Sequence, residues 1–172
     1  MSNLTYDKEK SNLGGISQLK FIYEKQLSQK IEIIKGQALE FVASSEFIVP
    51  DVIFESSSFK EDKKGVNLFE YEFKAFIARD DIEKVEACIR LDSNKIIALV
   101  KDNNNQTRLL GQKDNACALV LGFNKGASVS DRNAYELAIT WKSTHRAAMA
   151  NDAYIQTSHY QFEDGVFYDF DD

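Results

Sequence analysis

The chain has 172 residues, of which 44% are hydrophobic and 12% aromatic, so it is long and apolar enough to bury a core of its own, and intrinsic disorder is excluded. Its net charge is −6, and it has no run of basic residues accompanied by exposed aromatic residues. This argues against a protein that recognises DNA or RNA through a groove. Twelve Phe and seven Tyr stand against one Trp and two Met, a composition that favours strands.

The chain is expected to be a soluble protein, made inside a cell or in a particle assembled there. No apolar run approaches the ~20 residues that a membrane helix needs, so no membrane partner is expected. The N-terminus lacks the apolar core of a signal peptide. Two cysteines, Cys88 and Cys117, are too few for a disulfide framework and are interpreted as small buried residues.

The first third of the chain predicts an arm followed by short strands. Residues 1–13 are polar and are expected to form a flexible N-terminal arm. The alternation in Ile16–Tyr23 predicts the first strand. Two apolar stretches, Ile31–Ile34 and Leu39–Val42, are divided by Gly36 and are expected to be a pair of short strands.

The next stretch predicts a hairpin. Phe54–Phe59 is compatible with an exposed strand, and the charged hexapeptide Lys60–Gly65 is expected to be a solvated loop tip. Asn67–Ile77 is the clearest strand, because apolar and charged residues alternate along it with a period of two. The residues expected on the buried face are Phe69, Tyr71, Phe73, Ala75 and Ile77.

The period changes to that of a helix after Arg79. Ile82, Val85 and Ile89 recur at three and four residues and would make one apolar stripe. Asp80 lies where a helix N-terminus favours negative charge. An α-helix over about Asp80–Leu91 is therefore predicted to flank the sheet.

Four further strands are predicted over Ile96–Lys101, Thr107–Gly111, Ala116–Phe123 and Asn133–Ser143. The first two are joined by Asp102–Asn105, whose Asp and Asn residues favour a tight turn. Because the connections are mostly short, these strands are expected to form an antiparallel meander.

Together the elements predict a mainly β protein: an antiparallel β-sandwich or barrel with one flanking helix, long loops and terminal arms. One domain is expected over 1–172, with 144–172 as a C-terminal extension. No internal repeat or low-complexity linker divides the chain.

No constellation of catalytic or metal-binding residues is found in the sequence. The two histidines, His145 and His159, lack the convergent ligands of a zinc site. Gly14-Gly15 lacks the Lys-Ser/Thr of a P-loop, and an EF-hand counted from Asp102 lacks its Gly and Glu. We therefore expect no enzyme activity and no cofactor.

The end of the chain is acidic and aromatic at once. Like-charge runs are usually solvated tails. A contact between subunits is the alternative, because aromatic residues are too frequent here for a purely solvated segment. The acidic residues are Glu163, Asp164, Asp169, Asp171 and Asp172, and the aromatic ones include Phe162, Phe167, Tyr168 and Phe170.

The segment Asn67–Ser143 resembles, as a whole, the major tail tube proteins of phages and prophages of the Bacteroidetes type, which are related to the inner tubes of contractile injection systems. The motifs are Leu-Phe-Glu-Tyr-Glu-Phe-Lys74, Ala-Leu-Val-Lys-Asp-Asn-Asn104 and Asp-Arg-Asn-Ala-Tyr135. Asn105 and Ala134 stand where that family usually has Gly.

The resemblance implies a structural virion protein that assembles in the host bacterial cytoplasm into stacked, hexameric rings. The tube would contact other tail proteins and let DNA pass without specific binding. The N-terminal arm and the stretch Phe54–Gly65 are expected to contact neighbouring subunits. The individual contact candidates are Phe54, Phe59, Lys60, Lys63, Lys64, Phe167, Tyr168 and Phe170.

Two alternatives stay open. A tail terminator or head–tail connector protein would form a single ring of the same general kind. A small β-barrel that binds a ligand or acts as a hydrolase would instead need a deep pocket with convergent polar groups.

Overall fold

The computed structural model describes residues 15–27, 31–34, 36–38, 41–43, 47–50, 52–78, 94–125, 133–150 and 155–157. These residues are mainly β, and apart from one short 3-10 turn, η1 (Glu24–Gln26), they contain no helix. The α-helix predicted over about Asp80–Leu91 lies outside the described residues, and that prediction is not borne out.

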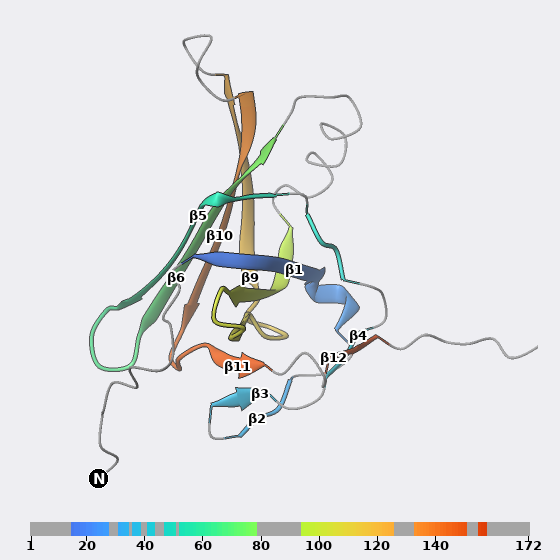
Figure 1. Ribbon diagram of the computed structural model, residues 1–172. Coiled ribbons are helices and arrows are strands. Elements are labelled where there is room, and N and C mark those ends of the chain that lie inside the picture. The colour runs from blue at the N-terminus through green and yellow to red at the C-terminus, as the bar shows by residue number, and fades with distance from the viewer. Residues whose placement is uncertain are drawn as a thin grey trace, which may run out of the picture.

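Ten strands form one sheet and two short strands form a second one. The order in the large sheet is β2-β3-β11-β8-β7-β9-β10-β6-β5, with β1 paired to β7 (Figure 1). The strands are β1 (Ile16–Tyr23), β2 (Ile33–Ile34), β3 (Gln37–Ala38), β4 (Phe41–Ala43), β5 (Val52–Lys63), β6 (Phe69–Ala78), β7 (Lys95–Asp102), β8 (Thr107–Leu110), β9 (Cys117–Lys125), β10 (Asn133–Ser143), β11 (Ala148–Ala150) and β12 (Ile155–Thr157).

The long strands β5, β6, β10 and β9 form one wall of the molecule (Figure 1). β10 and β6 pair without a register shift from Ala134 opposite Ala78 to Ser143 opposite Phe69. The predicted alternation of β6 is confirmed, since Tyr71, Phe73, Ala75 and Ile77 are buried and the residues between them are partly exposed. One face of this wall therefore covers the core and the other faces outward.

Strand β7 is buried on both faces, which explains its uninterrupted apolar run. On one face Ile96, Ala98 and Val100 join the main core, which also holds Phe21, Phe73 and Leu137. On the other face, Ile97 and Leu99 pack in a second core with Ile22, Leu27, Ile31, Ala38, Leu109 and Ala148. The turn after β7 is the predicted one, with Asn105 at a φ of 60° and the Asp102 Oδ1 atom accepting from the Asn104 and Gln106 amides at 2.8 and 2.9 Å.

The four strands predicted after Asn94 are confirmed, but their pairing as a simple meander is wrong. β8 and β9 both pair with the same edge of β7, β8 along Ala98–Lys101 and β9 at Lys95 and Ile96, and β9 then continues beside β10. Gly111 lies at this break, between the end of β8 and the start of β9. Its φ is +92°, and a Cβ there would lie 3.1 Å from the Ile96 carbonyl oxygen.

The sheet curls without closing. β1 and β5 contact each other, and the Phe21 and Ile48 amides exchange hydrogen bonds of 3.0 and 2.8 Å with each other's carbonyl groups. No strand ladder joins β1 to β5 among the described residues, because the hydrogen-bonded order ends at β5. The expected β-sandwich or barrel is therefore corrected: the ten-stranded sheet is open and does not close on itself.

Two boundaries also differ from the expected ones. The charged stretch from Lys60 to Lys63 belongs to β5 rather than to a loop, and the connection to β6 spans only residues 64–68. The expected C-terminal extension begins inside the sheet, because β11 lies between β8 and β3. The expected N-terminal arm, 1–13, lies outside the described residues.

Candidate assembly surface

The hairpin of β5 and β6 presents an apolar tip at one end of the sheet (Figure 1). Val66 is 84% exposed and Leu68 is 38% exposed. The Lys64 amide donates to the Leu68 carbonyl group at 2.8 Å, and Gly65 takes a φ of +94°, so the turn is well defined. A β-branched apolar side chain held on such a turn is suited to insertion into a neighbouring molecule.

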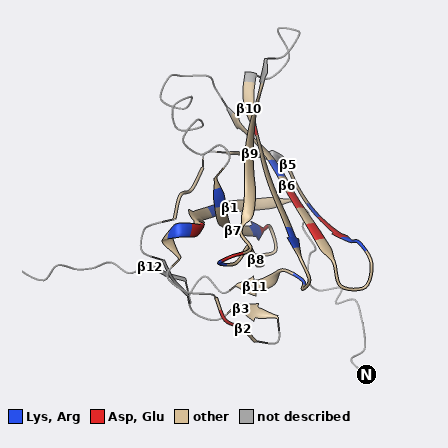
Figure 2. Ribbon diagram, turned by 180° about the vertical axis from the view of Figure 1, so that it is seen from behind, with Lys and Arg blue, Asp and Glu red and all other residues tan. Residues whose placement is uncertain are grey.

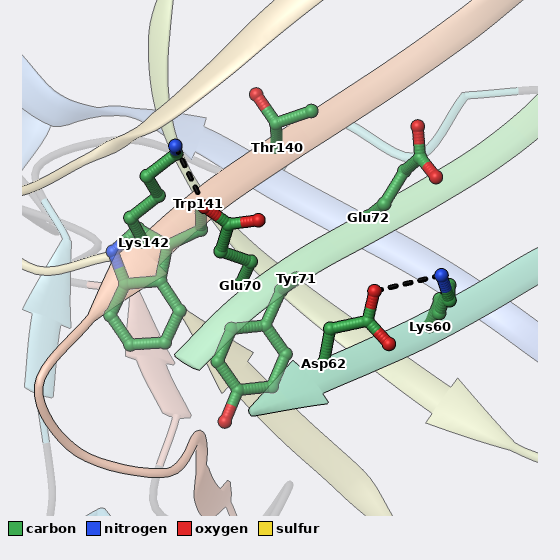
Figure 3. A pocket seen from close by; sticks show the side chains of 8 residues that line it. All are labelled: Lys60, Asp62, Glu70, Tyr71, Glu72, Thr140, Trp141 and Lys142. Atoms are coloured by element: carbon green, nitrogen blue, oxygen red, sulfur yellow. Dashed lines mark ion pairs between the residues drawn. The ribbon is translucent and has the colours of Figure 1, made fainter. Parts of the chain in front are cut away.

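The outer face of the wall carries acidic and basic residues in alternation across β5, β6 and β10 (Figure 2). Lys60 pairs with Asp62 at 2.7 Å, and Lys142 of β10 pairs with Glu70 of β6 at 2.8 Å (Figure 3). Lys74 and Glu72 form a third pair at 2.9 Å. The shallow pocket between these side chains has a volume of about 210 Å³. Both signs of charge are interleaved, so this face can match a surface of similar pattern but is not a single-sign patch for nucleic acid.

These ion pairs shift the protonation of their members. The hydrogen bond from Lys60 lowers the pKa of Asp62, and that from Lys142 lowers the pKa of Glu70. The hydrogen bonds to Asp62 and to Glu72 raise the pKa values of Lys60 and Lys74. The face therefore keeps its full pattern of charges at neutral pH, although exposed pairs of this kind add little to folding stability.

The inner face of the hairpin is tied to the chain that follows β10. The Tyr71 hydroxyl group accepts a hydrogen bond from the Ala147 amide at 2.7 Å, and its ring lies 5.3 Å from the ring of Trp141. Arg146 donates from Nε to Glu61 of β5 at 3.1 Å. Burial raises the pKa of Tyr71. The Tyr71 hydroxyl group and the Glu61 carboxylate together hold residues 146 and 147 against the hairpin.

The sheet ends at β5, and a groove of about 690 Å³ runs between this strand and the start of β1. Its walls include Ser58 and Glu61 of β5, Ile16 of β1, and Arg108 of β8. A terminal strand of a sheet is a template for another strand, unless something covers it. The groove therefore leaves space beside the sheet edge.

Metal binding and nucleophilic chemistry find little support in the described part of the chain. No group of three or more His, Cys, Asp or Glu side chains there could hold a metal ion. Cys117 is buried, and burial raises the pKa of its thiol group, which disfavours the nucleophilic thiolate. None of the described helical segments has the length and apolarity to cross a bilayer.

The structure brings the predicted contact residues of the hairpin together but places them differently. Lys60 and Lys63 are exposed on β5, Lys64 is exposed in the turn, and Lys63 lies over the Phe69 ring at 6.0 Å. Phe59 is half-buried against the main core and stacks on Tyr71 with ring centroids 6.1 Å apart. Phe54 lies in β5. Phe167, Tyr168 and Phe170 lie outside the described residues.

Sequence reasoning missed Val66 and Leu68 at the tip and Glu61 on the inner face. A signal for the tip was present, because two apolar residues flank Asn67 directly after the Gly65 turn. Glu61 gave no signal, since its contact with Arg146 joins residues far apart in the chain.

The comparisons with known proteins identify no relative of this chain. No protein-family model, no curated protein and no solved structure matches this chain.

Proposed function

We propose that this protein is a structural subunit that assembles with its own copies into stacked rings forming a phage tail tube. The observation that carries the proposal is the β5–β6 hairpin, which combines the terminal strand of the described sheet, an outer face of interleaved charges and an exposed apolar tip. The resemblance of the segment Asn67–Ser143 to major tail tube proteins supports the same reading.

The two sides of the proposed contact differ in kind. The tip with Val66 and the terminal strand β5 both lie on the hairpin, and we expect them to contact a different surface of the next copy. A surface that meets a different surface on the next copy makes a heterologous contact, which generates rings or filaments rather than closed dimers. Stacked rings are one such product.

The charge distribution is compatible with a conduit for DNA. Binding to phosphates depends on neutralisation by Lys and Arg, and the chain has 27 Asp and Glu against 21 Lys and Arg. On the outer face of the wall, Lys60 of β5 and Lys142 of β10 are paired with carboxylates. In the proposed tube DNA therefore passes without specific binding, and the tube contacts other tail proteins in the virion.

The test is the assembly state of the purified full chain. Light scattering and negative-stain electron microscopy should show rings and stacked rings of the native protein. Val66→Asp should abolish stacks while the circular dichroism spectrum and the melting temperature stay native. Val49→Asp is the matched control, because Val49 is also exposed, at 57%, but precedes β5 at the end of the hairpin opposite to its tip. Native protein that stays monomeric over a wide range of concentration and salt would contradict the proposal.

A deletion of Lys60–Lys64 is a poor test, because residues 60–63 pair with β6 and the deletion would damage the sheet. The same microscopy separates the alternatives. Single rings would favour a tail terminator or connector protein, and a monomer that binds a metabolite would favour a small ligand-binding protein or hydrolase.

A further inference from the structure

A second groove, of about 960 Å³, lies between the loop 112–115, the start of β2 and the residues after β10. Its apolar lining includes Ile31, Ile33 and Trp141. Three cationic or protonatable side chains also line it, Lys113, His145 and Arg146, together with the carboxylate of Asp114. Its volume is at the upper end of the range of about 300–1,000 Å³ for pockets that hold drug-sized ligands.

The walls of this groove are held by specific hydrogen bonds. The Gln112 side chain accepts from the Ile31 amide and donates to the Ile31 carbonyl group, both at 3.1 Å. The Trp141 Nε1 atom donates to the Asn115 carbonyl group at 2.9 Å. A groove with walls fixed in this way loses little conformational freedom when it is filled, which favours binding.

Arg146 is suited to contact both an aromatic ring and a carboxylate. Its guanidinium group lies 5.8 Å from the centre of the Phe69 ring and uses Nε for Glu61. An Arg side chain has five N–H donors in a planar fork, so one such ion pair engages only part of it. An occupant that carries acidic and aromatic side chains together would match this lining.

Residues 158–172 of this same chain have that composition. They hold five Asp and Glu, five aromatic residues and no Lys or Arg. The last described strand, β12, ends at Thr157. Fifteen residues in an extended conformation reach about 50 Å, which exceeds the ~40 Å diameter of a domain of this size. The segment is therefore long enough to reach the groove.

We propose that the acidic, aromatic segment 158–172 of this chain docks in the groove lined by Ile33, Trp141, Lys113 and Arg146. Aromatic side chains from Phe162 to Phe170 fill the apolar floor, and the carboxylates between them face the basic rim. The proposal does not depend on the tube, because it concerns a contact that a monomer or an assembled copy can make.

The test is photo-crosslinking in the full chain. p-Benzoylphenylalanine at position 167 or 170 replaces one aromatic residue with another, and the crosslinked peptides are mapped by mass spectrometry. Crosslinks to residues 31–36, 112–115 or 143–146 are the expected result. The same probe at position 6 is the control, because Tyr6 is also aromatic but lies outside the acidic segment 158–172 and should not label the groove.

Paired substitutions sharpen the result. Ile33→Asp puts a carboxylate on the groove lining and should weaken docking about tenfold, measured as crosslink yield. Ile34→Asp is the matched control, because Ile34 is 47% exposed, next to Ile33 at 41%, but does not line the groove. Lys113→Glu should also lower the yield, whereas Lys95→Glu should not.

The outcomes decide the proposal in either direction. A groove crosslink within one copy and a groove crosslink between copies both support it, and the mobility of the product on a denaturing gel distinguishes them. Crosslinks that map elsewhere, or equal losses with Ile33→Asp and Ile34→Asp in variants with native melting temperatures, would overturn it.

Discussion

Strand β7 and the β5–β6 hairpin differ in how many of their faces are buried. β7 has a core on each side, and Ile96 and Ile97 are both fully buried although they are adjacent. The hairpin has a core on one side, where Phe73 is fully buried, and interleaved charges on the other, where Lys60 and Glu72 lie. The comparison suggests that folding stability and assembly depend on different residues, which single substitutions can separate.

The largest effect is expected from a truncation inside β7. Leu99→Ala should lower the free energy of unfolding by about 2–5 kcal/mol, because the side chain is 2% exposed in the second core and leaves a cavity. Chemical denaturation measures the loss. Val120→Ala on the outer face of β9, where Val120 is 53% exposed, is the control and should change stability by less than about 1 kcal/mol. Equal losses in the two variants would remove the distinction between the regions.

The next effect is expected at the break between β8 and β9. Gly111→Ala should cost about 1–3 kcal/mol, because the new Cβ meets the Ile96 carbonyl oxygen and the Ile97 Cδ1 atom at 3.1 Å in a left-handed conformation. Thermal and chemical denaturation measure it.

Two other glycines separate the causes. Gly36 has a φ of +79° and open space around it, so Gly36→Ala measures the cost of the left-handed backbone alone. Gly122 has open space and no positive φ, so Gly122→Ala should leave the free energy of unfolding nearly unchanged. A Gly111→Ala protein as stable as the Gly122→Ala protein would contradict the role of Gly111 in the fold.

An effect of similar size is expected where the hairpin holds the chain after β10. Tyr71→Phe leaves the Ala147 amide without its acceptor, which should cost about 1–3 kcal/mol. Hydrogen exchange at the Ala147 amide should become faster, while the ring contact with Trp141 is kept. Unchanged exchange at this amide would show that the hydrogen bond does not hold the segment.

The smallest effect on stability is expected on the outer face. Because pairing lowers the pKa values of Asp62 and Glu70, their stabilising contribution is present at neutral pH and is lost as the pH falls below about 4. NMR titration of the Glu70 carboxyl group should show its pKa rising towards the ordinary value in Lys142→Ala. The same titration of Asp62 is the internal control, because Asp62 pairs with Lys60 and should not move.

The prediction of strands from sequence worked where the apolar period was clear. Alternation in Asn67–Ile77 and in Asn133–Ser143 marked β6 and β10 because each has one buried and one exposed face. The length of β5 was underestimated, since charged residues from Lys60 to Lys63 suggest a loop although their ion pairs and ladder with β6 accommodate them in a strand.

The candidate surface was only partly predictable. Lys60, Lys63 and Lys64 were identified from local charge, but the contacts that organise the surface join distant residues, such as Glu61 with Arg146. The second groove combines loop 112–115 with Ile31 and with the residues after β10, and no local pattern relates these three segments.

The sequence by itself determined that this protein is built of strands, because side-chain alternation is a local property of the chain. Only the tertiary structure decided how those strands are ordered. β8 and β9 share one edge of β7, and Gly111 between them adopts a positive φ at a point where a Cβ would be tightly packed against Ile96 and Ile97. The curl that brings β1 against β5 without closing the sheet, and so leaves β5 at its end, likewise depends on packing across the whole core.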